Sequence, residues 1–151
     1  MNHEFLQQVA EALKAETRKK YNFDEADLFA LSAAGQNSLT QSLKQYVIKN
    51  GTADIEGILL GKMDFRDSKF QATATEQLQK DLKERKILDD QQLQEVSSFS
   101  TDFLIKAIKD GFDQSGSSKD LDGICAFLGI DKTMLKMINS PVGKMFGKFF
   151  K

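Results

Sequence analysis

The stretch that decides the fold is residues 120–139, DLDGICAFLGIDKTMLKMIN. Its apolar spacing fits two short helices joined by a turn at Gly129, with the small residue Cys125 four positions earlier, where the helices would cross. The apolar positions that such a pair must bury are Ile124, Leu128, Ile130, Leu135 and Ile138. The spacing therefore predicts a helix-turn-helix-like unit, which in DNA-binding proteins places its second helix in the major groove.

Two interpretations of this unit stay open. The second helix would expose polar and basic side chains, namely Asp131, Lys132, Thr133, Lys136 and Asn139. Lys132 and Lys136 lie one turn apart and would meet phosphates, while Thr133 and Asn139 would reach base edges. Against DNA binding, Asp131 repels a phosphate, and no arginine follows Arg85. Two short helices that cross steeply need the same apolar pattern, so we favour a tri-helical unit that only packs.

The sequence ends in residues 141–151, PVGKMFGKFFK, which combine lysines with aromatic side chains. On a helix, Met145, Phe146 and Phe149 share one face, and the lysines lie largely off it. The candidate contact residues of this tail are Lys144, Phe146, Lys148 and Phe149. The tail would dock on the protein's own core, enter a partner's groove or lie on a membrane surface, and docking on the core is the default.

Helical periodicity continues outward over the whole chain, and no segment alternates like a strand. Amphipathic helices are predicted over about 67–86 and 91–112, which we expect to form a central antiparallel hairpin. Other helices are predicted at about 3–20, 26–34, 37–50, 52–60, 120–128, 132–138 and from 141 onward. We therefore expect one all-α domain over 1–151, a bundle of seven to nine helices, in which 118–151 contribute the helix-turn-helix-like subdomain and a basic, Phe-rich tail.

Several helix ends are predicted from capping residues. Asp24 and the Asp89-Asp90 pair stand where N-caps are expected, as do the acids Asp64 and Asp67. Gly35 is predicted to end the helix over 26–34, and Asn37 or Ser38 to begin the next.

Length and composition indicate a single globular domain. The chain has 151 residues, of which 40% are hydrophobic and 28% charged, so it is neither membrane-spanning nor compositionally disordered. The net charge is −1, but after Asp131 the sequence holds five lysines and no acid. One cysteine and the lack of a recognisable secretory signal lead us to expect a soluble cytoplasmic protein.

No residue pattern in the chain is typical of catalysis or of metal binding. The single histidine, His3, is near the start, and Cys125 is predicted to face the inside of a helix, where a thiol is inert. The segment GILLGKM at 57–63 lacks the spacing and the Ser or Thr of a phosphate-binding loop. We therefore expect no enzyme activity and no cofactor or metal.

A short internal similarity links ADIEGILLG at 53–61 to KDLDGICAFLG at 119–129. Both segments have two acids among their first four residues, contain a glycine before an isoleucine and end on a glycine. The similarity indicates either a duplicated unit or a shared pattern of helix start and helix stop, and the second interpretation is favoured.

Two segments resemble the YidB-like family of small uncharacterised bacterial proteins. They are SLKQYVIKNGTADIEGILLG at 42–61 and LDGICAFLGIDKTMLKMINSPVGKMFG at 121–147. The resemblance implies an all-helical fold with a homeodomain-like motif, and it implies no activity and no site residues.

We expect a non-catalytic helical protein that acts through protein–protein contacts, with the basic, Phe-rich tail as the candidate surface. DNA binding by 120–139 is the alternative. A protein partner is expected, a nucleic acid is the second choice, and a membrane surface is not expected. The sequence makes no prediction of the oligomeric state.

The DNA-binding alternative predicts a salt-dependent affinity for duplex DNA. A fluorescence titration should give a plot of log affinity against log salt with a slope of roughly −0.9 for each phosphate contacted. Changing Lys132→Glu together with Lys136→Glu should abolish the binding. No binding at low salt, or no effect of the double change, would contradict the alternative.

Overall fold

The computed structural model of the protein describes residues 1–131 and 133, and these residues form helices and no strand. The elements are α1 (His3–Lys20), α2 (Glu25–Asn50), α3 (Ala53–Leu59), the 3-10 helix η1 (Phe65–Asp67), α4 (Lys69–Arg85), α5 (Asp90–Gln114) and α6 (Leu121–Leu128). The all-α prediction is therefore confirmed for the part described. The predicted helices at 132–138 and from 141 onward, and with them the second half of the helix-turn-helix, lie outside the described residues.

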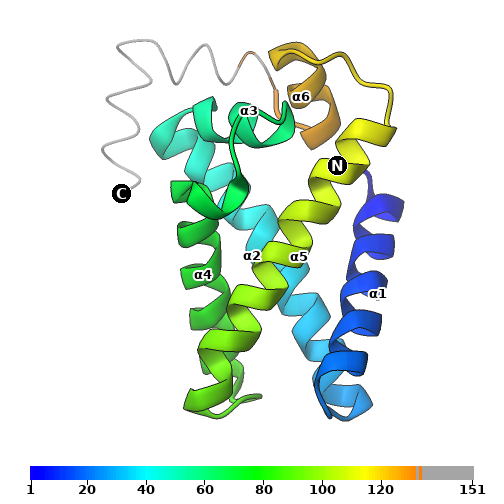
Figure 1. Ribbon diagram of the computed structural model, residues 1–151, viewed down its shortest axis with the longest axis vertical. Coiled ribbons are helices and arrows are strands. Elements are labelled where there is room, and N and C mark those ends of the chain that lie inside the picture. Colours follow the sequence, from blue (N-terminus) through cyan, green and yellow to red (C-terminus); the bar gives the residue numbers. More distant parts are fainter. Residues whose placement is uncertain (132, 134–151) are drawn as a thin grey trace.

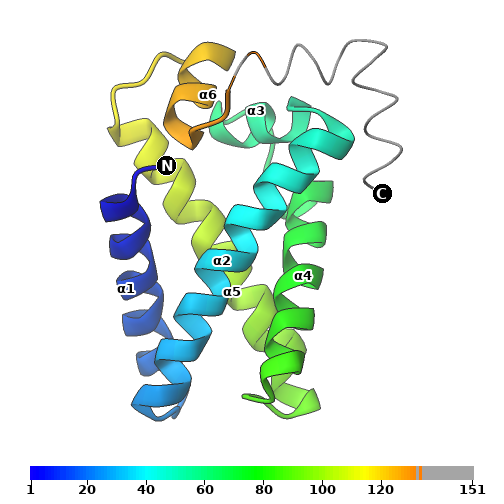
Figure 2. The same cartoon turned by 180° about the vertical axis from the view of Figure 1, so that it is seen from behind.

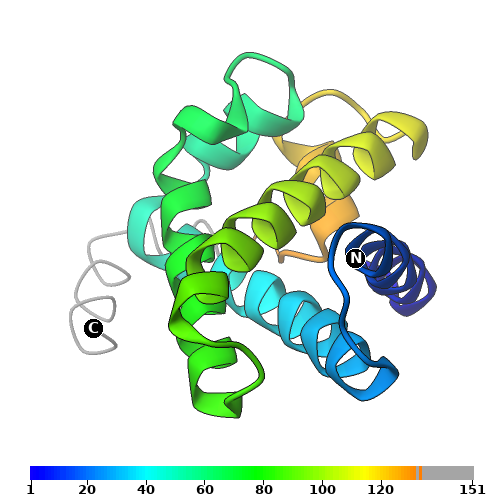
Figure 3. The same ribbon diagram turned by 60° about the horizontal axis from the view of Figure 1, so that its bottom comes forward.

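Four long helices form the body of the bundle. Helices α1 and α4 stand on opposite sides, and α2 and α5 cross between them on opposite faces (Figures 1 and 2). The two connections at one end, between α1 and α2 and between α4 and α5, come forward in Figure 3. The short helices α3 and α6 cover the other end (Figure 1).

Helix α2 differs most from the prediction. It is one continuous helix of 26 residues, so the predicted helix end at Gly35 and the restart at Asn37 or Ser38 are wrong. A Cβ on Gly35 would lie 3.1 Å from Leu104 Cδ1 and 3.2 Å from Leu13 Cδ2. The glycine therefore serves the close approach of α1, α2 and α5, and it does not end a helix.

The predicted hairpin of the two amphipathic helices is present as α4 and α5, but it is not the centre of the bundle. The most extensive contact between two helices is that of α2 with α4, followed by α4 with α5 and α1 with α2. Helix α2 also contacts α5, so it packs against all three other long helices. The sequence-based prediction places the hairpin at the centre of the bundle because it divides residues 26–50 into two short helices.

The core consists of two clusters of buried side chains. The smaller one joins α2, α4 and α5 near their connected ends through Leu31, Ala34, Leu78, Leu82, Leu93 and Val96. The larger one draws residues from all six α-helices, among them Leu13, Val47, Ile58, Phe70, Phe112 and Ile124. The helices α3 and α6 thus cover the larger cluster at the end of the bundle opposite the two connections (Figure 1).

Aspartate side chains cap several helices, and those of Asp24, Asp64 and Asp89 do so as predicted. The Oδ1 atoms of Asp24, Asp89 and Asp120 each accept a hydrogen bond from the backbone N–H three residues later, at 2.8, 2.8 and 2.9 Å. Asp64 caps η1 by the same kind of bond. The expectation for Asp67 is wrong, because Ser68 caps α4 and Asp67 lies within η1. These bonds satisfy N–H groups that have no partner inside the helix.

The internal sequence similarity corresponds to two neighbouring helices. Its first copy forms α3 and its second α6, and the two helices are in contact. Each is followed by a glycine in the left-handed region, Gly61 with φ 73° and Gly129 with φ 72°. Both helices therefore stop at a left-handed glycine, whereas only α6 has a side-chain N-cap. The duplicated unit and the shared pattern both stay predictions.

The side chain of Tyr46 ties α3 to α2. Its hydroxyl donates a hydrogen bond to Asp54 Oδ2 at 2.6 Å, and its ring packs edge-on against Phe70. Burial, followed by the contact with the Asp54 carboxylate, raises the pKa of Tyr46 to about 12.

Changing Tyr46→Phe should reduce the free energy of unfolding by about 1 kcal/mol at neutral pH, because one hydrogen bond is lost. The pKa of Tyr46 is higher in the folded state than the usual value near 10. The contribution of the hydroxyl is therefore complete below pH 10 and is lost as the pH rises towards 12. Urea unfolding of both proteins at pH 8 and pH 11 should show a difference that shrinks with pH, and a constant difference would contradict this account.

The glycine inside α6 should not tolerate a side chain. A Cβ on Gly123 would lie 1.8 Å from the backbone oxygen of Ser118, so Gly123→Ala should destabilise the protein by about 1–3 kcal/mol despite its better helix propensity. The control is Ala126→Gly on the exposed side of the same helix, which should cost only about 1 kcal/mol. Thermal unfolding measures both, and a neutral or stabilising Gly123→Ala would show that the contact is wrong.

Candidate interaction surfaces

A groove lies at the covered end of the bundle, between the start of α1, the end of α5 and α6, with a volume of about 660 Å³. The residues that line it have no charged side chain: Met1, Asn2, Phe5, Gln8, Gly111, Gln114, Ser115, Ala126, Phe127 and Gly129. Because 28% of the chain is charged, such a surface stands out from the rest of the protein. We call it the uncharged groove, a name that refers to its side chains, because the amino group of Met1 also lies beside Gly129 of this lining.

Two aromatic rings form the apolar part of the uncharged groove. Phe5 of α1 and Phe127 of α6 meet edge to face with their ring centroids 5.5 Å apart, and Phe127 meets the buried Phe112 at 5.6 Å. Both groove rings are half-buried. They are therefore fixed by the core on one side and available to a partner on the other.

A glycine lets the Phe5 ring lie directly on α5. A Cβ on Gly111 would lie 2.4 Å from Cε2 of Phe5 and 3.5 Å from the Phe127 ring. The ring occupies the space that any larger residue at position 111 would fill. Gly111 thus sets how closely α1 approaches α5 at the groove.

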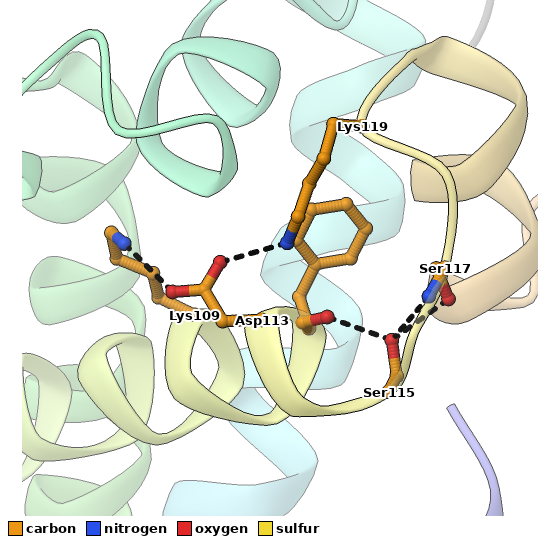
Figure 4. A network of polar contacts seen from close by, with 6 residues as sticks. Lys109, Asp113, Ser115, Ser117 and Lys119 are labelled. Atoms are coloured by element: carbon orange, nitrogen blue, oxygen red, sulfur yellow. Dashed lines mark hydrogen bonds and ion pairs between the residues drawn. The ribbon is translucent and has the colours of Figure 1, made fainter.

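Charged and hydroxyl side chains at the end of α5 hold the loop that leads to α6 (Figure 4). Asp113 accepts hydrogen bonds from Lys109 Nζ at 3.1 Å and Lys119 Nζ at 3.0 Å. These bonds, first from Lys119 and then from Lys109, lower the pKa of Asp113. Lys119 Nζ also lies 4.4 Å from the centroid of the Phe112 ring. The network links Lys119, at the start of the segment that carries Phe127, to the end of α5.

Serine hydroxyls close the same loop on the side of the groove. Ser115 Oγ donates to the carbonyl of Phe112 at 2.7 Å and accepts from the N–H of Ser117 at 3.2 Å. Ser118 Oγ donates to Asp120 Oδ1, the atom that caps α6. The loop is therefore folded by its own short side chains, and α6 keeps a fixed place beside α5.

A second row of aromatic rings lies where the turn between α1 and α2 meets α5. Tyr21 stacks on Phe23 at 5.4 Å and meets Phe99 edge-on at 6.0 Å. Lys20 Nζ lies 4.3 Å from the centroid of Phe99, and the Tyr21 hydroxyl donates to Glu95. A lysine already covers this row, so it offers a partner less apolar surface than the uncharged groove.

A small cavity in the core of the bundle is lined entirely by apolar residues. It has a volume of about 20 Å³ and lies under α3 and α6, against α2, α4 and α5. Its lining comprises Leu43, Ile55, Ile58, Leu59, Phe70, Ile105, Ile108 and Leu128. A space of this size is near the minimum for one water molecule, so it belongs to the packing of the core.

Most residues singled out from the sequence lie outside the described part: Lys132, Lys136, Asn139, Lys144, Phe146, Lys148 and Phe149. Thr133 is described and exposed, and its N–H donates to Asp131 Oδ1 at 2.8 Å. The predicted second helix itself lies outside the described residues. DNA binding by this helix and partner binding by the tail stay predictions.

The residues with the strongest intrinsic reactivity lie apart from the uncharged groove's lining. Cys125 is buried, as predicted, and His3 is exposed at the start of α1. Over residues 1–131 and 133, no three His, Cys, Asp or Glu side chains come together as a metal site would require. None of the helices described is both long and apolar enough to cross a membrane.

Sequence reasoning missed the uncharged groove because its walls come from three distant segments. The sequence places Phe5 on the apolar face of the predicted helix at 3–20, and no sequence pattern distinguishes Gly111 or Gln114. One signal was present: the run from Gly123 to Ile130 holds no charged residue in a chain rich in charge. Only the packing of α6 against α1 shows that this run continues into an uncharged surface.

Comparison of the chain with protein-family models, with curated proteins and with solved structures finds no match. The resemblance to the YidB-like family therefore stays a prediction.

Proposed function

We propose that this is a non-catalytic helical protein that acts through protein–protein contacts, and that the uncharged groove receives an amphipathic helix of a partner protein. The observation that carries the proposal is the lack of any charged side chain among the ten residues that line the groove. Interface centres are depleted of charged residues and enriched in aromatic ones. The groove has both properties.

The chemistry of the uncharged groove suits the apolar face of a helix. The half-buried rings of Phe5 and Phe127 offer apolar contact, and the exposed methyl group of Ala126 belongs to the same lining. The amides of Gln8 and Gln114 can accept or donate hydrogen bonds at the edges. Recognition of a helix in a groove uses apolar residues spaced three or four positions apart.

The preformed position of these groups favours binding. The loop before α6 is held by the hydrogen bonds of Asp113, Ser115 and Ser118, so α6 does not have to be ordered when a partner arrives. A surface that is already ordered loses less conformational entropy on binding. We further propose that the protein acts in the cytoplasm, since its single cysteine suits a reducing compartment.

A lysine placed in the uncharged groove tests the proposal. Ala126 is exposed and lines the groove, so Ala126→Lys should leave the fold intact. Helical peptides selected from a displayed library against the full protein should lose at least about tenfold in affinity for this variant, because binding would bury an unpaired charge. Titration by fluorescence anisotropy measures the affinity.

The matched control is Ala72→Lys, which adds the same charge on the exposed side of α4. It should leave the affinity of the selected peptides unchanged. Recovery of no helical peptide, or of peptides whose affinity is the same for both variants, would overturn the proposal.

A further inference from the structure

The chain leaves the continuously described part of the structure beside the uncharged groove. Gly129 lines the groove, and the continuous description ends two residues later, at Asp131. The basic, Phe-rich tail at 141–151 follows after a connection formed by residues 132–140. An extended connection of this length spans up to about 30 Å. The tail can therefore reach back to the groove from which the chain departs.

The sequence of the tail has the pattern that the uncharged groove requires of a partner helix. On a helix, Met145, Phe146 and Phe149 share one face, at spacings of three and four positions. Three lysines form a stripe beside that face, at spacings of four and three positions: Lys144, Lys148 and Lys151. A helix that places this apolar face in the groove therefore presents its lysines to one rim of the groove.

The rim that α1 forms carries exposed acids. Gln8 lines the groove, and Glu4 and Glu11 lie one turn before it and one turn after it on the same side of α1. Within residues 1–131 and 133, neither of these carboxylates takes part in an ion pair. The first lysine of α1 is Lys14, which is paired with Glu25. This rim therefore offers two carboxylates to a basic partner.

The spacing of these acids matches the spacing of the tail's lysines. Glu4 and Glu11 are seven positions apart, and so are Lys144 and Lys151. Seven positions of a helix cover about 10 Å, so two helices that lie side by side can pair both acids with lysines. The amino group of Met1, which lies next to the groove, precedes this row of acids and does not interrupt it.

We propose that the tail at 141–151 occupies the uncharged groove of its own chain, with its apolar face against Phe5 and Phe127 and its lysines beside Glu4 and Glu11. The inference rests on the proposed function, because it gives that groove an internal occupant that a partner helix must displace. A segment held by a short connection has an effective concentration in the millimolar range. The tail of the same chain is therefore favoured over the tail of a second copy.

Competition with a partner helix tests the proposal. In the full chain, Phe146→Ser together with Phe149→Ser should raise the affinity of helical peptides that bind the groove at least about tenfold, because a groove that is free only a tenth of the time lowers their apparent affinity tenfold. The control is Phe29→Ser, at an exposed phenylalanine of α2, which should leave the affinity unchanged. Equal affinity of the native chain and the tail variant for peptides that Ala126→Lys weakens would overturn this inference and leave the proposed function standing.

Cross-linking locates the tail without any peptide. A chain that carries Gln8→Cys and Gly147→Cys should be closed on itself by a short bismaleimide reagent and keep the mass of one chain. The matched control pairs Gly147→Cys with Ala72→Cys, on the exposed side of α4, and should not be closed. Cys125 is buried and does not compete for the reagent. Equal yields from the two pairs, or links between chains instead of within them, would overturn the proposal.

Discussion

The close approach of three helices at Gly35 is the constraint on which the bundle depends. With no Cβ at this position, the side chains of Leu13 and Leu104 reach the backbone of α2 from both neighbouring helices. On α5, the small residues Ser97 and Ser100 are also fully buried. Because of this close approach, α2 packs directly against α1 and α5, and it remains one continuous helix along the whole bundle.

The short helices α3 and α6 cover the larger cluster of buried side chains at one end of the bundle. The larger cluster of buried residues extends to that end, and α3 and α6 close it with Ile55, Ile58, Ile124 and Leu128. Each cover helix is fixed by a few specific contacts: Tyr46 with Asp54 for α3, and the loop network around Asp113 for α6. The uncharged groove lies where α6 ends against α1, so its shape follows from this cover.

Amphipathic helices were predictable and the centre of the bundle was not. In α4, Phe70, Ala74, Leu78 and Leu82 lie on one face, so periodicity identified the helix and its buried side. Helix α2 contacts three other long helices and buries residues around much of its circumference, so its sequence shows little periodic contrast. In such a segment Gly35 resembles a helix end, because local patterns do not record which residue a neighbouring helix approaches.

The sequence by itself determined the helical class, most helix boundaries and the aspartate caps, because these follow from interactions between residues a few positions apart. It also determined that Cys125 is buried, because Cys125 lies on the same face of α6 as the apolar residues Ile124 and Leu128. Only the tertiary structure decided that α2 is continuous and that Phe5, Gly111 and Phe127 share one groove. Residues more than a hundred positions apart meet there, and such contacts depend on how whole helices pack against one another.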